Sequence, residues 1–183
     1  MIAALLVLAS QQAVPPPVVQ WTANCAAPVY ATDRLVCGDA ELARADDAMI
    51  SWLGRWRPPP VAGFAPWRES QEAWLKRRSL CAFRTSHRQC VVDAYAERMA
   101  VLRLVNATVE TATDVAWRCG AMTGRWRDQA MLLIEPDGTP AGLAMRQASR
   151  SGWQPYLRLD GAGSKLRIVP SEGKPIRCVR EVR

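Results

Sequence analysis

Six cysteines in three intervals constrain the fold of this chain more than any other feature. The intervals run from Cys25 to Cys37, from Cys81 to Cys90 and from Cys119 to Cys178. An even number of cysteines without a Cys-x-x-Cys pair is typical of a disulfide framework, which persists only in an oxidising compartment. Six cysteines allow fifteen pairings, and we predict the sequential one. The framework places the protein outside the cytoplasm, in the periplasm or secreted.

The N-terminus predicts export. Met1 to Ala9 is an apolar run, and a stretch of three prolines, Pro15 to Pro17, follows it. This pattern is typical of a secretion signal with a polar end, so we assign residues 1–20 to a signal-like segment and a proline-rich lead. The run is too short to cross a bilayer. No later segment is more apolar, so we expect no membrane span.

Residues 21–105 have the periodicity of helices. Apolar side chains follow a potential N-cap, Asp39, at spacings of three and four, and Pro58–Pro60 ends that pattern. A second helix is expected from about Pro66 to Cys81 and a third from about His87 to Val105. A Cys81–Cys90 bridge would then close a helical hairpin.

Residues 114–183 have the pattern of short strands. A polar linker is expected at 106–113, and runs of alternating residues then alternate with glycine-containing turns. The expected strands are Val115–Cys119, Met131–Glu135, Leu143–Gln147, Tyr156–Asp160, Lys165–Val169 and Ile176–Val179. The predicted fold class is α+β as two segregated domains: a disulfide-stapled helical hairpin or bundle, followed by a small antiparallel β-barrel or sheet.

The charges and reactive residues restrict the function. The net charge of +7 is spread along the chain, which suits a basic surface for anionic envelope polymers; export argues against nucleic acid. A single histidine, His87, lies inside a short cysteine interval, and neither a zinc spacing nor a phosphate-binding glycine loop is present. We therefore predict a protein that is not an enzyme, with no cofactor and no metal. Distant carboxylates brought together by the fold remain an alternative.

The helical half resembles the LprI N-terminal family over about residues 22–105. Three stretches carry the resemblance: Cys25 with Thr32–Asp46, Ser70–Cys81, and Cys90–Leu102. The matching residues are Asp33, Arg34, Val36, Cys37, Asp39, Glu41, Leu42, Gln71, Trp74, Leu75, Cys81, Cys90, Tyr95 and Arg98. The resemblance implies an exported helical domain associated with lysozyme inhibition. We expect the polar members of this set to be caps and packing residues.

The β half resembles the MliC family, small β-barrels that inhibit C-type lysozyme, over about residues 114–180. The matching features are Val115–Cys119, Ser151-Gly152 followed by Tyr156, and Cys178. In that family a serine-bearing loop and a lysine enter the lysozyme cleft. The lysine normally lies in a Trp-x-Lys-Gly stretch that this chain lacks, and Lys165 and Lys174 are nearby. The resemblance thus implies that Ser151, Gly152, Tyr156 and Lys165 are the candidate residues of the inhibitory loops.

Two functions follow from these features. The first is an exported, non-enzymatic lysozyme inhibitor or lysozyme-resistance factor, whose partner is a C-type lysozyme or a related muramidase. A rigid loop would donate hydrogen bonds to the two carboxylates of the glycosidase cleft. The alternative is an envelope module that binds peptidoglycan or another anionic polymer without inhibiting an enzyme.

Overall fold

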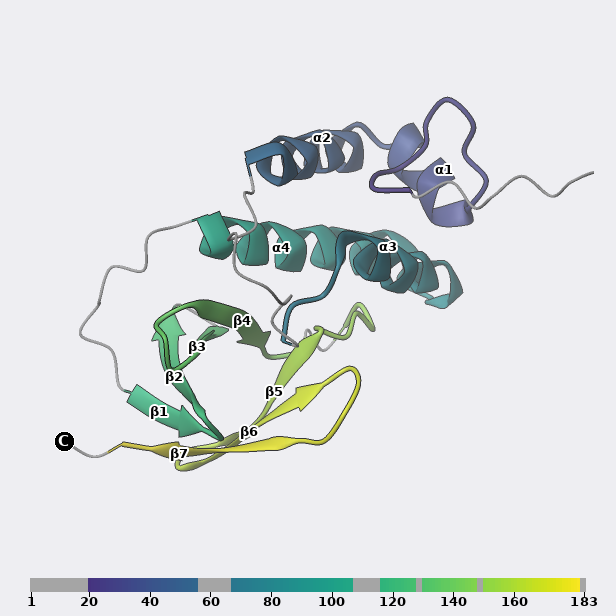
Figure 1. The fold of residues 1–183 in the computed structure, drawn as a ribbon. Helices are drawn as coiled ribbons and strands as arrows, with labels where there is room; N and C mark the ends of the chain where they lie inside the picture. The colour runs from purple at the N-terminus through teal and green to yellow at the C-terminus, as the bar shows by residue number, and fades with distance from the viewer. Residues whose placement is uncertain (1–19, 56–66, 107–115, 128–129, 148–149, 182–183) are drawn as a thin grey trace, which may run out of the picture.

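The computed structural model describes residues 20–55, 67–106, 116–127, 130–147 and 150–181. A layer of helices lies against one side of a β-barrel (Figure 1). The signal-like segment, the Pro58–Pro60 stretch and residues 107–113 of the expected linker lie outside the described residues.

The helices occupy the first half of the chain. They are α1 (Ala31–Gly38), α2 (Ala40–Arg55), α3 (Gln71–Ser79), a short 3-10 helix η1 (Leu80–Phe83), and α4 (His87–Asn106). The expected start of the last helix at His87 is confirmed. The second predicted helix begins later than expected, because Ser70 is its cap: the Ser70 hydroxyl accepts a hydrogen bond of 3.0 Å from the backbone N–H of Ala73.

Seven strands form a closed barrel in the second half. They are β1 (Ala116–Cys119), β2 (Met122–Arg127), β3 (Ala130–Ile134), β4 (Pro140–Met145), β5 (Leu157–Ala162), β6 (Lys165–Pro170) and β7 (Ile176–Arg180). Consecutive strands are neighbours, and β1 pairs with β7 to close the barrel. The pairs are antiparallel except β4 with β5, which are parallel where Met145 faces Arg158. Closure removes the exposed sheet edges that an open sheet would leave.

The sequence pattern did not indicate β2. This strand contains Gly124 between polar and aromatic residues, a composition that weakens strand signals. A side chain at Gly124 would bring its Cβ within 2.7 Å of Met131 Sδ. The strand therefore depends on close packing inside the barrel, which only the folded structure shows.

Three disulfides join the cysteines in sequential pairs: Cys25–Cys37, Cys81–Cys90 and Cys119–Cys178. The first ties the segment before α1 to α1, and the second joins η1 to the first turn of α4. The third links neighbouring residues of β1 and β7. It therefore covalently closes the seam of the barrel.

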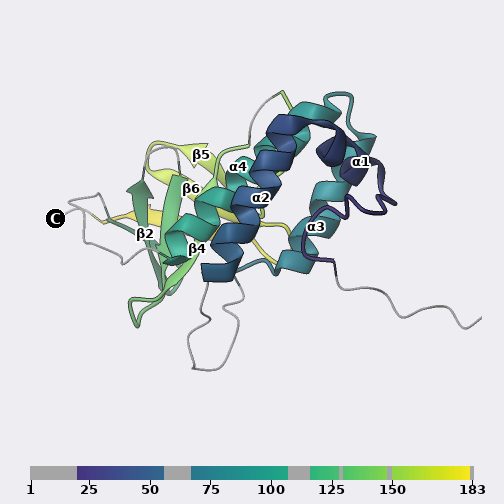
Figure 2. The same ribbon diagram turned by 90° about the horizontal axis from the view of Figure 1, so that it is seen from above.

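The prediction of two segregated domains is wrong, because the helices and the barrel share a core. Leu104 of α4 packs in one buried cluster with Leu132 and Ile134 of β3 and Leu143 of β4. Trp153, which precedes β5, belongs to the hydrophobic core of the helices. Helix α4 runs between α2 and the barrel (Figure 1), and Figure 2 shows α2 alongside α4 from above. Sequence periodicity identifies apolar faces, but it does not show which partner will cover them.

Candidate functional site

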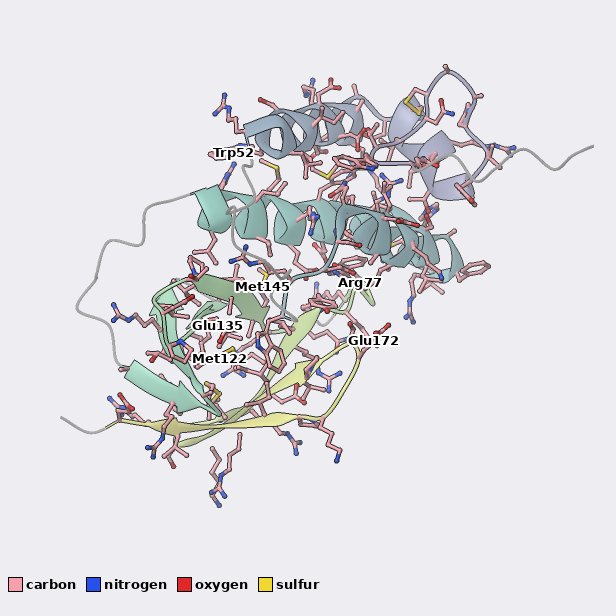
Figure 3. All side chains as sticks on the ribbon, viewed as in Figure 1. Trp52, Arg77, Met122, Glu135, Met145 and Glu172 are labelled. Carbon is pink, nitrogen blue, oxygen red and sulfur yellow. A yellow bond between two sulfur atoms is a disulfide. The ribbon has the colours of Figure 1, made fainter. Side chains whose placement is uncertain are left out.

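A buried polar network joins the helices to the barrel. Glu97 of α4 accepts hydrogen bonds from the indole Nε1 of Trp153 and, at 2.8 Å, from the backbone N–H of Tyr156. Arg77 of α3 forms an ion pair of 3.3 Å with Glu97 and a two-pronged pair with Glu69, in which Nη2 lies 2.6 Å from Oε2. The Arg77 guanidinium also stacks 4.1 Å from the Trp153 ring centroid. In Figure 3, Arg77 points into the junction between the two halves.

The pKa shifts of this network follow from burial and pairing. Burial raises the pKa of Glu97, and Arg77 and the N–H donors of Tyr156 and Trp153 offset only part of this effect. Burial by itself would lower the pKa of Arg77, but its pairs with Glu69 and Glu97 outweigh burial and raise it. Arg77 is therefore held between two carboxylates within the junction, and this pairing indicates a structural role.

A groove of about 340 Å³ opens beside this junction. Its apolar lining includes Leu80, the Cys81–Cys90 bridge and Pro170, and three arginines contribute to it. Arg77 is already paired, and Arg158 forms a two-pronged pair with Asp160 at 2.9 Å. Among the residues that the structure describes, Arg84 is the arginine of this groove with no carboxylate partner. The groove therefore has little cationic character to offer an anion apart from Arg84.

The structure places Ser151 and Gly152 inside the junction. Ser151 is only 2% exposed, and its hydroxyl accepts a hydrogen bond of 3.1 Å from the backbone N–H of Trp153. This placement gives no support for a direct contact between the Ser151 hydroxyl and a partner. Gly152 has a φ of 73°, and a Cβ there would lie 3.2 Å from the Cδ of Arg84. The missing side chain leaves room for the stem of Arg84.

The other two predicted loop residues lie at opposite ends of the β5–β6 hairpin. Tyr156 immediately precedes β5 and is half-buried beside Glu97, to which its backbone N–H donates. Lys165 begins β6 and is exposed at the hairpin tip, facing Ala162 of β5. Ala162, the partner of Lys165, lies six residues after Tyr156, so at about 3.3 Å per residue the strand separates these positions by roughly 20 Å. The fold does not bring Ser151, Gly152 and Tyr156 together with Lys165.

Two large apolar side chains are exposed at the Cys81–Cys90 bridge, one inside the loop that it closes and one just before Cys81. Phe83 is 86% exposed and Leu80 is 55% exposed. Backbone hydrogen bonds of 3.0 Å from Arg84 N–H to the Cys81 carbonyl and of 2.9 Å from Cys90 N–H to the Ser86 carbonyl fix the loop. The exposed ring is therefore carried by a constrained backbone.

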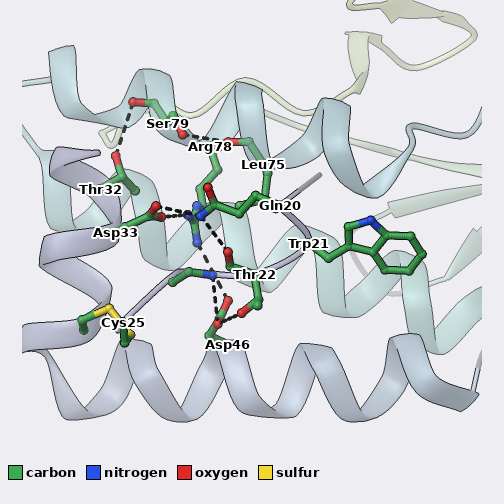
Figure 4. A network of polar contacts seen from close by, with 12 residues as sticks. Gln20, Trp21, Thr22, Cys25, Thr32, Asp33, Asp46, Leu75, Arg78 and Ser79 are labelled. Carbon is green, nitrogen blue, oxygen red and sulfur yellow. Dashed lines mark hydrogen bonds and ion pairs between the residues drawn. A yellow bond between two sulfur atoms is a disulfide. The ribbon is translucent and has the colours of Figure 1, made fainter. Parts of the chain in front are cut away.

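Asp33, Asp46 and Arg78, polar residues of the LprI-like stretches, lie in buried contacts between helices (Figure 4). Arg78 is fully buried; it forms an ion pair with Asp33 and donates to the hydroxyl of Tyr95, which in turn donates to Asp46 at 2.7 Å. Burial raises the pKa of Tyr95, so its hydroxyl stays protonated at neutral pH. Most of these buried groups find partners in one another, although Nε of Arg78 has none, and this pairing suits the packing role expected for the motif.

Three further motif residues, Gln71, Trp74 and Arg98, are also buried. Arg98 donates to the side chain of Gln71 at 2.8 Å, and the Gln71 amide donates to the backbone carbonyl of Trp21 at 2.7 Å. Burial lowers the pKa of Arg98 to about 10, so it remains charged at neutral pH. Trp74 is fully buried beside Tyr95, with ring centroids 5.3 Å apart. The resemblance therefore marks a stabilising core and not a reactive centre.

His87 has no catalytic arrangement around it in the described part of the chain. Its Nε2 lies 3.3 Å from the hydroxyl of Thr32, and that hydroxyl also donates to the Ser79 carbonyl. Burial lowers the pKa of His87, so the ring is neutral at pH 7. These contacts pack α1 against the Cys81–Cys90 loop.

Sequence reasoning missed the residues that organise this region: Arg77, Glu97, Trp153, Phe83 and Arg84. One signal was available for the last two, because Phe83 is an isolated apolar residue among polar neighbours in a short cysteine interval. No such signal exists for Glu97, because two of its partners, Trp153 and Tyr156, lie more than fifty positions away along the chain.

The chain is similar to proteins named lipoprotein LprI. It is 24% identical over 182 aligned residues to lipoprotein LprI of Mycobacterium tuberculosis (strain ATCC 25618 / H37Rv), with 87% of this chain and 91% of the relative covered. The same values apply to lipoprotein LprI of Mycobacterium bovis. Residues 22–105 make up less than half of the chain, so the match extends into the β half. The similarity supports an LprI-like protein.

No protein-family profile matches the chain, and the resemblance of the β half to the MliC family is not shown. No solved structure matches it either. Within the described ranges, no helix is long and apolar enough to cross a bilayer. The disulfides and the similarity to lipoproteins fit an exported or envelope protein.

Proposed function

We propose that this chain is an exported, non-enzymatic protein that binds a lysozyme and blocks its glycosidase cleft. The observation that carries the proposal is the similarity to lipoprotein LprI, which extends over both halves of the chain. The LprI-like motif residues of the helices imply lysozyme inhibition, and the same residues form the buried network that stabilises this fold.

The architecture suits binding without catalysis. The three disulfides and the shared core constrain the surface loops before a partner arrives, which reduces the ordering cost of association. The most deeply buried ionisable groups are engaged in structural pairs: Glu97 with Arg77, and Asp33 with Arg78. These pairings support a structural role for the groups in this proposal.

Electrostatics sets a condition on the partner. C-type lysozymes are basic, and this chain carries +7, so long-range repulsion would slow association at low ionic strength. Close contacts between a cationic side chain and the two cleft carboxylates would compensate at short range. The association rate should therefore rise with added salt, opposite to the behaviour of a polymer-binding module.

The polymer-binding alternative has weaker support. This alternative depends partly on tryptophan side chains that would stack on sugar rings. However, Trp74, Trp117 and Trp153 are buried in the cores. Among the described tryptophans, Trp21 is the one that is more than half exposed, at 57%. One strongly exposed indole among the described tryptophans is a poor platform for a polysaccharide chain.

The test is an inhibition assay with the oxidised full chain and purified lysozymes of several classes. Micromolar protein should lower the rate of cell-wall hydrolysis, and isothermal titration should give a saturable complex. A pull-down on isolated peptidoglycan at rising salt serves as the control. An unchanged rate for every lysozyme class contradicts the proposal, and binding to peptidoglycan alone would favour the alternative.

A further inference from the structure

The Cys81–Cys90 loop carries the most exposed apolar side chain among the described residues. Phe83 is 86% exposed, and Leu80, three positions before it, is 55% exposed. Burying a phenylalanine side chain is worth about 1.5–3 kcal/mol, and the fold leaves this stabilisation unused because the ring is exposed. Clustered exposed apolar residues mark interaction sites more often than isolated ones do.

The loop is held from three sides. The disulfide joins η1 to α4, the hydroxyl of Thr32 reaches both the Ser79 carbonyl and His87, and the two backbone hydrogen bonds described above fix the turn. A large side chain on such a loop binds with little loss of conformational freedom. Two further exposed residues, Val29 at 73% and Tyr30 at 55%, immediately precede α1, which packs against the loop.

A cation lies next to the exposed ring. Arg84 is exposed, and it has no carboxylate partner among the described residues. Its stem runs against Gly152, where a side chain would come within 3.2 Å of Cδ. The segment before β5 thus positions Arg84 at the edge of the groove, beside Leu80 and the bridge. This explains how Ser151-Gly152 contributes to the surface without the Ser151 hydroxyl reaching it.

We propose that Phe83 and Arg84, on the Cys81–Cys90 loop, are the contact that enters the glycosidase cleft of the partner. The inference rests on the proposed function and names its binding surface. A glycosidase cleft combines two carboxylates with a surface that receives a sugar ring. The flat Phe83 ring occupies the position of a sugar, and the Arg84 guanidinium pairs with a cleft carboxylate through charge-assisted hydrogen bonds. Both side chains are exposed, so a partner can reach them.

The experiment compares two pairs of neighbouring residues in the full oxidised chain. Phe83→Ser and Arg84→Glu change the proposed contact. Val179→Ser and Arg180→Glu, on β7, are matched controls, because Val179 is 45% exposed and is also followed by an exposed arginine. The lysozyme inhibition constant and the dissociation constant from titration are measured for each variant, with the melting temperature as the check on folding.

Each loop variant should weaken inhibition by at least about tenfold, and both controls should stay near wild type. Arg84→Lys should recover part of the affinity, since it keeps the charge without the planar fork. If wild type inhibits and the loop variants inhibit equally well, this contact is wrong while the proposed function stands. Loss of inhibition in Lys165→Glu alone would assign the contact to the barrel hairpin and overturn the inference.

The experiment also distinguishes a lysozyme from a second copy of the chain as the binding partner of the loop. If light scattering shows a dimer that Phe83→Ser converts to a monomer without changing inhibition, the loop binds a second copy of the chain and the inference is overturned. If wild type inhibits no lysozyme, the proposed function fails first, and the inference falls with it.

Discussion

Glu97 of α4 accepts a hydrogen bond from the indole Nε1 of Trp153, a residue 56 positions later in the chain. The same carboxylate accepts from the backbone N–H of Tyr156 at 2.8 Å, just before β5 begins. One side chain of the helical half thus satisfies two donors of the β half. This contact, with the core shared by α4, β3 and β4, makes the unfolding of one half depend on the other.

Leu143→Ala tests that dependence. Leu143 lies on β4 and is 7% exposed in the cluster it shares with Leu104. Removing its buried methyl groups should lower the unfolding free energy by about 2–4 kcal/mol. Because the core is shared, the unfolding of the helices, followed by far-UV circular dichroism, should move to lower denaturant concentration. The unfolding transition followed by tryptophan fluorescence should move with it. Val179→Ala, at an exposed site, is the control, and a helical transition that stays in place would show independent halves.

Glu97→Gln tests the effect of burial on the junction carboxylate. The folded protein raises the pKa of Glu97 above its ordinary value of 4.5, so the folded state retains the proton to higher pH than the unfolded state. The contribution of Glu97 to stability is fully present below the ordinary pKa and is lost as the pH rises through the raised one. The unfolding free energy of the variant should therefore improve relative to wild type between pH 4 and pH 7. A difference that is independent of pH would contradict this assignment.

Asp39 at the start of α2 should show the opposite dependence. Its carboxylate accepts from the backbone N–H of Glu41 at 2.9 Å and pairs with Arg88 at 2.7 Å, and the pairing with Arg88 and the backbone hydrogen bonds lower its pKa below 3.8. Its stabilising effect is present above the ordinary pKa and is lost as the pH falls through the lowered one.

Asp39→Ala should consequently lower the melting temperature at pH 7, and the difference from wild type should shrink in acid. Asp39→Asn keeps a good cap residue and removes the ion pair, so its loss should be smaller. Equal melting temperatures for Asp39→Ala and wild type at pH 7 would mean that the cap contributes nothing.

Removal of the barrel disulfide should cost more stability than removal of the loop disulfide. Cys119 and Cys178 are separated by 59 positions, whereas Cys81 and Cys90 are separated by 9. In the chain-entropy description the longer loop is worth about 4 kcal/mol and the shorter about 2.5 kcal/mol. Double replacement by alanine at each pair, followed by denaturant unfolding, measures both values. A larger loss at the shorter loop would show that local packing around Cys81 outweighs chain entropy.

The two halves of the sequence differ in how well they predicted the structure. Three- and four-residue spacing of apolar side chains indicated the long helices, and period-two alternation indicated β5 and β6, where buried and exposed residues do alternate. Strand β2 escaped notice, because Gly124 and its polar neighbours carry no strand pattern and its pairing with β1 and β3 comes from contacts within the barrel. The parallel pairing of β4 with β5 was not predicted either, because it also comes from contacts within the barrel.

The candidate site shows the same division. The sequence indicated Ser151-Gly152 as a candidate segment. In the structure the serine hydroxyl is buried and accepts a hydrogen bond from the backbone N–H of Trp153, and the missing side chain of Gly152 leaves room for Arg84. The exposure of Phe83 depends on how η1 turns between α3 and α4, which the residue types alone do not specify.

By itself, the sequence determined the oxidising environment, the order of helices before strands and the positions of the main apolar faces, because these depend on residue type and on spacing along the chain. Only the tertiary structure decided that α4 covers the barrel, that Glu97 joins the two halves, and that Phe83 is left outside. The physical reason is that burial and hydrogen-bond satisfaction belong to pairs of segments far apart in the chain, and those pairs form only when the chain folds.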